Sequence, residues 1–192
     1  MEQRKGFWAR LWGHFSTITY HKWLVFGYCC KLGLPWRGLC HDLSKYSPTE
    51  FWAGVRYFQG NRSPNDAQRQ AEGCSTAWLH HKGRNRHHLE YWVDYDPAGT
   101  GNLIGNRMPS QFVAEMFCDR IAASRVYKKQ DYTDASPWEY FSRGRGHYII
   151  HPETEALLEW MLALLKEQGE DRAFKQIRQY LKDGQLQSVA TE

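Results

Sequence analysis

Histidines and carboxylates are the residues of this chain whose order could do chemistry. His41 and Asp42 are adjacent in the segment LCHDLSKYS. On a helix neighbouring residues point about 100° apart, so the pair could offer one imidazole nitrogen and one carboxylate to a single ion or to a pair of ions. Such dipeptides are common by chance, and the prediction therefore depends on further ligands elsewhere. The candidates are His21, His80, His81 and Asp119. Together these residues predict a metal pocket built from helices.

The first predicted helix carries His21 on its apolar face. Ser16 or Thr17 can cap a helix that runs to about Leu32, and Gly33 stops it. The residues that recur on this face at the helical period are Ile18, His21, Val25, Tyr28 and Leu32. His21 is therefore expected to be buried.

A carboxylate occupies a core position on a second predicted helix. Ser110 can cap a helix over residues 111–127. The face that recurs there at the helical period consists of Phe112, Met116, Asp119, Ala123 and Val126. An ionised carboxylate that is buried without a partner is strongly destabilising, so Asp119 must meet a cation, a network of donors or a metal, or else be protonated. One metal explains Asp119, His21 and the His41-Asp42 pair more economically than three separate causes.

The segment WLHHKGRNRHHLEYW, residues 78–92, supplies the remaining candidate ligands. If it is helical, one face carries Trp78, His81, Asn85, His88 and Trp92, and the neighbouring face carries His80, Arg84, His87 and Tyr91. Two histidines seven residues apart could then lie on both sides of a metal cleft, with Asn85 between them. Gly83 is a weak point in such a helix, and a basic surface segment is the alternative interpretation.

Three basic residues near these candidates could bind an anionic substrate. Lys45 lies one turn after His41, where its ammonium group could contact a phosphate oxygen or a hydroxide at the metal. An exposed lysine at a helix C-terminus is the alternative. Arg84 and Arg86 likewise either hold an anionic substrate or are only solvated.

The rest of the chain also predicts helices. Ser47-Pro48-Thr49-Glu50 is a capping box that opens a helix to about Phe58. The other expected helices cover residues 36–45, a stretch from about 67 to the histidine cluster, 137–143, 153–168 and 171–181, with loops at 60–66 and 95–110. No alternating strand pattern and no repeat is found. We therefore predict an all-α fold with a single compact domain over residues 1–192, whose metal-binding core covers about 16–165 and precedes a C-terminal amphipathic helix.

Composition restricts the class of protein. The net charge is +4, but residues 1–90 hold 13 Lys/Arg against 6 Asp/Glu and seven of the nine histidines, whereas residues 91–192 hold 12 against 15. A basic half rich in histidine suits a phosphorylated substrate or nucleic acid, and a solvated basic surface is the alternative.

Five cysteines without CxxC spacing indicate neither a disulfide framework nor a zinc ribbon, so we expect reduced thiols in a cytoplasmic protein. The most apolar segment, residues 18–34, is too short and polar to span a bilayer, and no membrane partner is expected.

The order of these motifs resembles the HD-domain superfamily of metal-dependent phosphohydrolases. His21, then His41-Asp42 in HDLSK, then His80-His81 and then Asp119 are similar to its H…HD…D set, which binds one metal on helices while further histidines hold a second. HDLSK is similar to the HDxGK form of cyclic-dinucleotide phosphodiesterases, in which the lysine matters to the site. This chain lacks GYP after the paired histidines and has HHKGRNRHH where an acidic segment is usual, which argues against that substrate.

A closer resemblance is to a small uncharacterised domain family of bacterial and phage proteins. It rests on HDLSKYSPTEF, AWLHHKGRNRHHLEYW and the aspartate of EMFCDR, and it covers roughly residues 16–165. This likeness supports the choice of positions more than a function.

We predict a metal-dependent phosphohydrolase that acts on a phosphorylated small molecule or a nucleotide. One divalent ion is expected on His21, His41, Asp42 and Asp119. A second is expected on His81 and His88 or on His80 and His87, with Asp42 bridging, and the predicted catalytic residues are Asp42, Lys45 and Asn85, with Lys45, Arg84, Arg86 and His87 binding substrate. Manganese, iron, zinc, cobalt and nickel all fit mixed nitrogen and oxygen ligands.

Two other functions remain open from the sequence. Some HD-type folds hold two irons and activate dioxygen, so a di-iron oxygenase is the first alternative. The second is a non-enzymatic module that binds nucleic acid or a protein partner through its Trp and Arg residues, with the histidines as structure.

Overall fold

The computed structural model describes residues 6–189. The helices are α1 (Phe7–Leu32), α2 (Pro35–Cys40), α3 (Pro48–Tyr57), α4 (Pro64–Glu72), α5 (Thr76–Lys82), α6 (Ser110–Lys128), α7 (Ser136–Gly144) and α8 (Pro152–Val189). Short 3-10 helices cover Leu43–Tyr46, Leu89–Trp92 and Lys129–Asp131, and the strands are β1 (Val93–Tyr95) and β2 (Leu103–Gly105). The all-α class is confirmed. The domain predicted over 1–192 includes residues 1–5 and 190–192, which lie outside the described residues.

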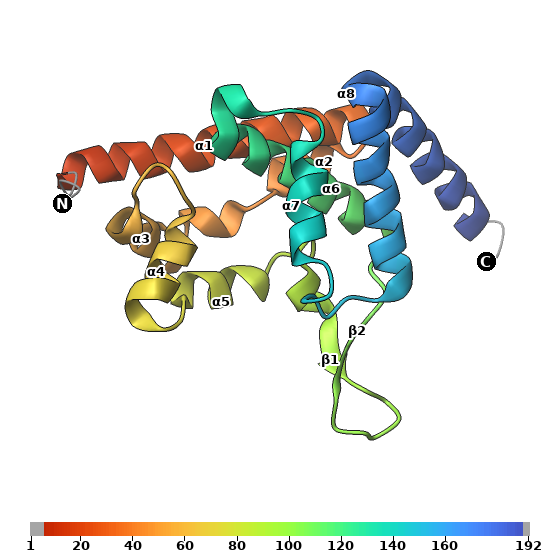
Figure 1. The fold of residues 1–192 in the computed structure, drawn as a ribbon, viewed down its shortest axis with the longest axis horizontal. Helices are drawn as coiled ribbons and strands as arrows, with labels where there is room; N and C mark the ends of the chain where they lie inside the picture. The colour runs from red at the N-terminus through yellow and green to blue at the C-terminus, as the bar shows by residue number, and fades with distance from the viewer. Residues whose placement is uncertain (1–5, 190–192) are drawn as a thin grey trace.

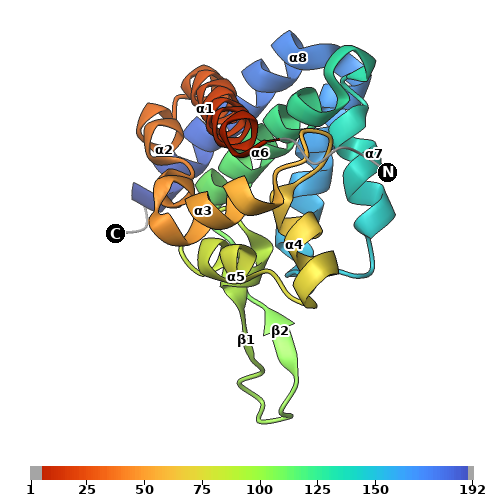
Figure 2. The same cartoon turned by 90° about the vertical axis from the view of Figure 1, so that its left-hand side faces the viewer.

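α1 is the helix around which the others assemble. It runs along one side of the molecule and contacts α2, α3, α6 and α8 (Figure 1). α6 packs against α7 and α8, and α3 contacts α4 and α5. The antiparallel hairpin of β1 and β2 projects away from the helices in both views (Figures 1 and 2). None of the described helices combines the length and the apolar character that crossing a membrane requires.

The hydrophobic core lies where α1, α6 and α8 pack together, around fully buried side chains such as Val25, Phe117 and Leu165. His21 is buried as predicted, at 8% exposure. α1 begins at Phe7, well before the predicted start, so Ser16 and Thr17 lie inside the helix and do not cap it. Their hydroxyls instead donate to the Gly13 carbonyl inside the helix.

The predicted helix over 36–45 is wrong. α2 ends at Cys40, and Asp42 has a left-handed backbone with φ 53°. The Lys22 ammonium donates to the carbonyls of Leu39 and His41, which the interrupted helix leaves without helical partners. The backbone therefore turns at His41 and Asp42, and these side chains do not diverge as they would on a continuous helix.

The helical stretch expected from residue 67 into 78–92 is also wrong. Gly73, at φ 78°, ends α4, and Ser75 begins α5 by accepting the Trp78 amide. α5 stops at Lys82, before Gly83, the weak point that the sequence indicated, so the faces predicted for 78–92 do not exist beyond that residue. Glycine adopts the left-handed conformation without steric cost, and a serine cap restarts the helix. The chain after α5 is thereby free to turn its later histidines back toward the first ones.

Other boundaries agree with the sequence more closely. Ser47 accepts the Glu50 amide at the start of α3, as predicted. α7 and α8 cover the expected C-terminal helices, and the break between 153–168 and 171–181 is the non-helical Gly169. The expected loop over 95–110 contains part of the hairpin, whose strands are too short to show an alternating pattern. Ser110 is the first residue of α6 and not its cap.

α1 and α3 cross where the ring of His14 packs directly against the backbone of Gly54. His14 is 6% exposed, and a Cβ atom at Gly54 would lie 2.1 Å from its Nε2 atom. Burial and the charge of Lys45 lower the pKa of His14 to about 4, so its ring is neutral near pH 7. Only glycine fits at position 54 while His14 keeps this place.

Gly54→Ala is therefore expected to destabilise the chain by about 1–3 kcal/mol through overpacking. Gly27→Ala, in the same long helix as His14, is the matched control because a Cβ there meets nothing within 4 Å. That change should stabilise by about 0.5–1 kcal/mol. Urea unfolding of the three chains measures both effects, and a Gly54→Ala variant as stable as the wild type contradicts the packing described.

Candidate metal centre

The buried carboxylate of Asp42 lies at the middle of the site. Its Oδ2 atom is 3.2 Å from His41 Nε2 and 3.9 Å from His21 Nε2. Its Oδ1 atom is 3.3 Å from His81 Nε2 and 3.4 Å from His87 Nε2. The two oxygens of one carboxylate therefore face two different groups of histidines.

The first group joins three elements of the fold. His21 comes from α1, His41 and Asp42 from the turn after α2, and Asp119 from α6. Asp119 Oδ1 is 2.9 Å from His21 Nε2 and 3.6 Å from His41 Nε2. One ligand atom from each of the four residues lies within 4.8 Å of the others. The packing of α1 against α6 brings together residues nearly a hundred positions apart.

The second group consists of Asp42, His81, His87 and His88, and its ligand atoms also lie within 4.8 Å of one another. His81 comes from α5, and His87 and His88 come from the turn that follows it. The ring of His88 lies 4.8 Å from that of His81 and 4.2 Å from that of His87, measured between centroids. The end of α5 at Lys82 is what allows these three rings to meet.

Glu115 contacts two of these histidines, His41 and His87, at the ring nitrogens that do not face Asp42. Its Oε1 atom accepts from His41 Nδ1 at 3.0 Å and lies 3.2 Å from His87 Nδ1. Burial alone would raise the pKa of Glu115, but its bonds to the two histidines outweigh burial and lower it to about 2. An anionic partner on Nδ1 fixes that proton there, so both Nε2 atoms are directed toward Asp42.

Glu50 has the same role on the other side. It accepts from His81 Nδ1 at 2.8 Å and from His80 Nδ1 at 2.6 Å. His81 is thereby oriented with Nε2 toward Asp42, whereas His80 belongs to none of the three clusters of possible ligands among the described residues. A third such cluster, His41, His87 and Glu115, is the arrangement in which Glu115 holds two Nδ1 atoms.

The atoms that converge on the two positions are buried, and most of them lack a hydrogen-bond partner. Within the described residues this holds for Nε2 of His41, His87 and His88 and for Oδ1 of Asp42, whereas His21 Nε2 lies 2.9 Å from Asp119 Oδ1 and Asp42 Oδ2 lies 2.6 Å from Lys45 Nζ. Buried polar atoms without partners are strongly destabilising, and native proteins almost always satisfy them. Divalent cations bound by lone pairs from both sides would satisfy them. The residues present therefore fit one or two ions, and imidazole with carboxylate is a donor set that transition metals accept.

The two aspartates of the site are held in their ionised form by the basic side chains beside them. Burial would raise the pKa of the Asp42 carboxyl, but the attraction of His41 and Lys45 outweighs it and holds this pKa well below its usual range. The same balance, with His21 and His41 as partners, keeps the pKa of Asp119 low. Lys45 Nζ lies 2.6 Å from Asp42 Oδ2. Both carboxylates are anionic, as cation binding requires.

The other predicted residues lie at several distances from this centre. Asn85 donates to Ser44 Oγ at 2.9 Å and to the His81 carbonyl at 2.8 Å, beside the second group but outside it. Arg84 donates to the His80 carbonyl, and Arg86 packs over the Tyr91 ring. His87, predicted to bind substrate, lies among the possible metal ligands.

Two important residues were missed in the sequence. Glu115 lies four residues before Asp119, on the same face of α6 and inside the apolar run FVAEMF, so its position carried the same information as that of Asp119. Glu50 was interpreted as half of a capping box, although its carboxylate binds His80 and His81 instead. Nothing local in the sequence distinguishes those two uses of a glutamate.

Comparisons with known proteins extend this description. A family model described as "Family of unknown function (DUF5662)" matches residues 10–164. Searches of the curated proteins and of the solved structures found no match to the chain. The region matched includes every residue of both histidine groups, and the resemblance to HD-domain phosphohydrolases stays a prediction.

His80 and His81 provide a matched test of metal binding. Both are bonded to Glu50, but only His81 directs a ring nitrogen at Asp42. His81→Ala is expected to bind one ion fewer than the wild type, and His80→Ala the same number, by elemental analysis after dialysis. Helical circular dichroism serves as the folding control. An equal metal content in the two folded variants contradicts the assignment of the second group.

Glu115 is expected to act through the histidines that it holds. Glu115→Gln removes the negative charge from the two Nδ1 atoms and should weaken metal affinity about 10–100-fold. The control is Glu90→Gln, since Glu90 is exposed. Competition with a chelator of known affinity measures both variants, and unchanged affinity in Glu115→Gln would show that His41 and His87 need no such support.

Proposed function

We propose that this chain, which belongs to the family of unknown function DUF5662, is a metal-dependent phosphohydrolase acting on a phosphorylated small molecule or a nucleotide. The observation that carries the proposal is that the two carboxylate oxygens of Asp42 face different histidines. One oxygen faces His21 and His41, and the other faces His81 and His87. A carboxylate between two sets of nitrogen ligands suits a pair of ions. The resemblance of HDLSK to HD-domain enzymes supports the same reaction.

Hydrolysis here requires a nucleophile and the stabilisation of negative charge. When bound, divalent ions polarise a phosphoryl oxygen and lower the pKa of a water molecule that serves as nucleophile. A bond forms between the water oxygen and phosphorus, and the ester P–O bond breaks. One proton of the water ends on the leaving oxygen, and the other passes to solvent or to the phosphate product. The ligand side chains themselves are neither oxidised nor reduced.

Lys45 is the residue of the chain best placed to meet the phosphoryl group. Its ammonium is held by Asp42 Oδ2, and its side chain keeps 28% of its surface exposed. Burial would lower the pKa of Lys45, but the negative charges of Asp42 and Asp119 raise it, so the amine stays protonated. A fixed cation beside the reacting group stabilises the charge that develops in the transition state.

The roles of the other predicted residues follow from their contacts. Asn85 and Ser44 surround the Nδ1 side of His81, and Asn85 is therefore a positioning residue in this proposal. Asp42, whose carboxylate belongs to both clusters of possible ligands, would serve as a ligand shared by the two positions. His87 and His88 would complete the second position, and in this proposal His87 is a metal ligand, as one of the two predicted pairs had it, and not a substrate-binding residue.

The test is phosphate release from a panel of phosphomonoesters and nucleotides by the metal-loaded protein. We expect turnover without any requirement for oxygen, lost in Asp42→Asn together with the bound metal. Lys45→Met should keep its metal and lower kcat by about 100-fold, the usual effect of removing one group that stabilises the transition state. A Lys45→Met variant with wild-type kcat contradicts the role of Lys45.

Two results would replace the proposal. Product formation by iron-loaded protein only in the presence of oxygen, without phosphate release, would indicate the di-iron oxygenase. A folded protein that binds no stoichiometric metal and shows salt-dependent binding of nucleic acid would indicate the non-enzymatic module.

A further inference from the structure

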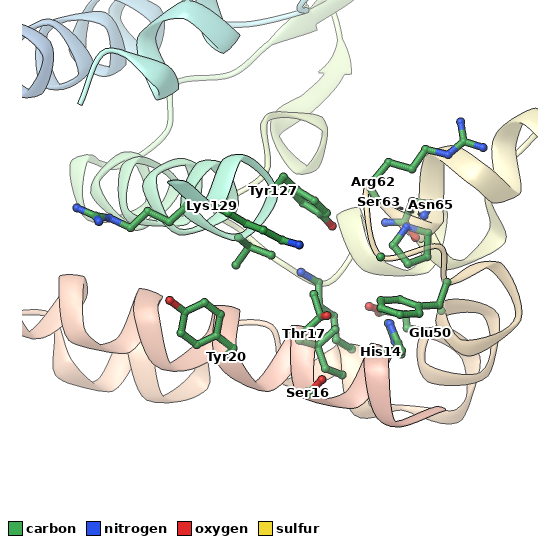
Figure 3. A pocket seen from close by; sticks show the side chains of 18 of the residues that line it. His14, Ser16, Thr17, Tyr20, Glu50, Arg62, Ser63, Asn65, Tyr127 and Lys129 are labelled. Carbon is green, nitrogen blue, oxygen red and sulfur yellow. Dashed lines mark hydrogen bonds between the residues drawn. The ribbon is translucent and has the colours of Figure 1, made fainter. Parts of the chain in front are cut away.

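We propose, resting on the function above, that the cavity beside Lys45 binds the substrate and that Lys129 selects a phosphoester carrying a second anionic group. The site is a cavity of about 640 Å³ lined by residues of α1, α3, α4 and the end of α6 (Figure 3). This volume is in the range of small-molecule sites. Lys45 and Glu50, which both contact the histidine centre, form part of its wall.

The cavity lies beside the centre, along the same two helices, and Lys45 and Glu50 belong to its wall. Thr17 lies one turn before His21 on α1, and Tyr127 lies two turns after Asp119 on α6. In Figure 3 the Tyr127 hydroxyl, on α6, and the Lys129 ammonium, directly after α6, point toward the space above Thr17. A molecule whose phosphoryl group meets Lys45 would therefore extend between these two helices.

Lys129 and Arg62 are the cations of the cavity wall that lack a counterion among the described residues. No carboxylate in the part of the chain that the structure describes lies within ion-pair distance of either, whereas Lys45 is paired with Asp42 and Arg125 with Glu170. Arg62 is bonded to the amides of Gln59 and Gln70, and its guanidinium points away from the centre of Figure 3. Lys129 is thus the charge of this wall that is available to a ligand.

The backbone of Lys129 is unusual as well. It has φ 53° and ψ −114°, and within residues 6–189 the other residue besides glycine with positive φ is Asp42. This backbone conformation is energetically unfavourable for a lysine, so the surrounding structure must stabilise it, and residues in such conformations concentrate at functional sites. One of the two strained residues holds the histidine groups together, and the other directs an ammonium into the adjoining cavity.

A second hollow on the other side of the centre suits substrate less well. It is lined by Glu115 and by Arg84, Arg86 and His87, the last three of which the sequence favoured for substrate binding. It reaches His87 from the side of Glu115, which binds the Nδ1 atom, and not from the side of Asp42. Arg37 there is already paired with Glu115 at 3.4 Å. The basic side chains of this hollow therefore lie on the Nδ1 side of His87 and not on the side that faces Asp42.

The arrangement specifies the chemistry of the substrate. One phosphoryl group meets Lys45 and the metal centre, and a separate phosphate or carboxylate meets Lys129. Between them the wall offers hydroxyls of Ser16, Thr17, Tyr20, Ser63 and Tyr127. A polar spacer with hydroxyl groups, such as a sugar, fits this lining better than a hydrocarbon chain.

Nonhydrolysable phosphonates test the inference without relying on activity. The probes are propylphosphonate, propane-1,3-bisphosphonate and pentane-1,5-bisphosphonate, titrated calorimetrically into the protein loaded with the metal that it binds. We expect that at least one of the two bisphosphonates, the one whose length fits, binds about tenfold more tightly than propylphosphonate, because a charged hydrogen bond to Lys129 is gained. That gain should disappear in Lys129→Met and persist in Lys129→Arg. It should also persist in Lys175→Met, the control at an exposed lysine of α8.

The outcomes separate this inference from the proposed function. If propylphosphonate shows no metal-dependent binding, both are overturned. If it binds but neither bisphosphonate gains affinity, or if the gain survives in folded Lys129→Met, the role of Lys129 alone is overturned. Loss of the gain in Arg84→Met, with Lys129→Met unaffected, would move the second anion to the opposite hollow.

Discussion

The burial of the Asp42 carboxylate is the constraint on which the rest of the structure depends. Asp42 is 2% exposed, and its oxygens face imidazole nitrogens on two sides. A charge in this position is tolerated only if cations or polarised donors surround it. The turn after α2, the end of α5 and the packing of α6 against α1 each supply one part of that surrounding. The fold can therefore be described as a set of helices arranged around one carboxylate.

The two glutamates show how this arrangement is kept in place. Glu115 and Glu50 bind the Nδ1 atoms of the histidines, so the Nε2 atoms converge on Asp42. Without these anions each ring could rotate or change tautomer, and the convergence would be lost. The cavity beside Lys45 adjoins this buried centre, and Lys129 lies in its wall.

Much of the fold and part of the site could be predicted from the sequence. The helical period placed His21 and Asp119 on apolar faces, and in the structure their side chains meet at 2.9 Å. The helical interpretation failed at Asp42 and after Lys82, where the backbone turns. The first turn is stabilised by tertiary contacts, the Lys22 bonds to the carbonyls of Leu39 and His41, which no local pattern contains. The second begins at Gly83, which the sequence indicates as a weak point. The sequence offered two pairs of possible ligands, His81 with His88 or His80 with His87, and it could not show that His87 joins His81 and His88 in one cluster while His80 does not.

Anomalous X-ray diffraction from crystals grown with manganese tests the central claim most directly. The arrangement of ligands predicts two peaks, one among His21, His41, Asp42 and Asp119 and the other among Asp42, His81, His87 and His88. Both peaks should lie within bonding distance of the Asp42 carboxylate. Density only at other residues, such as the more exposed His147 and His151, with none beside Asp42, would contradict the claim that this carboxylate bridges two ions.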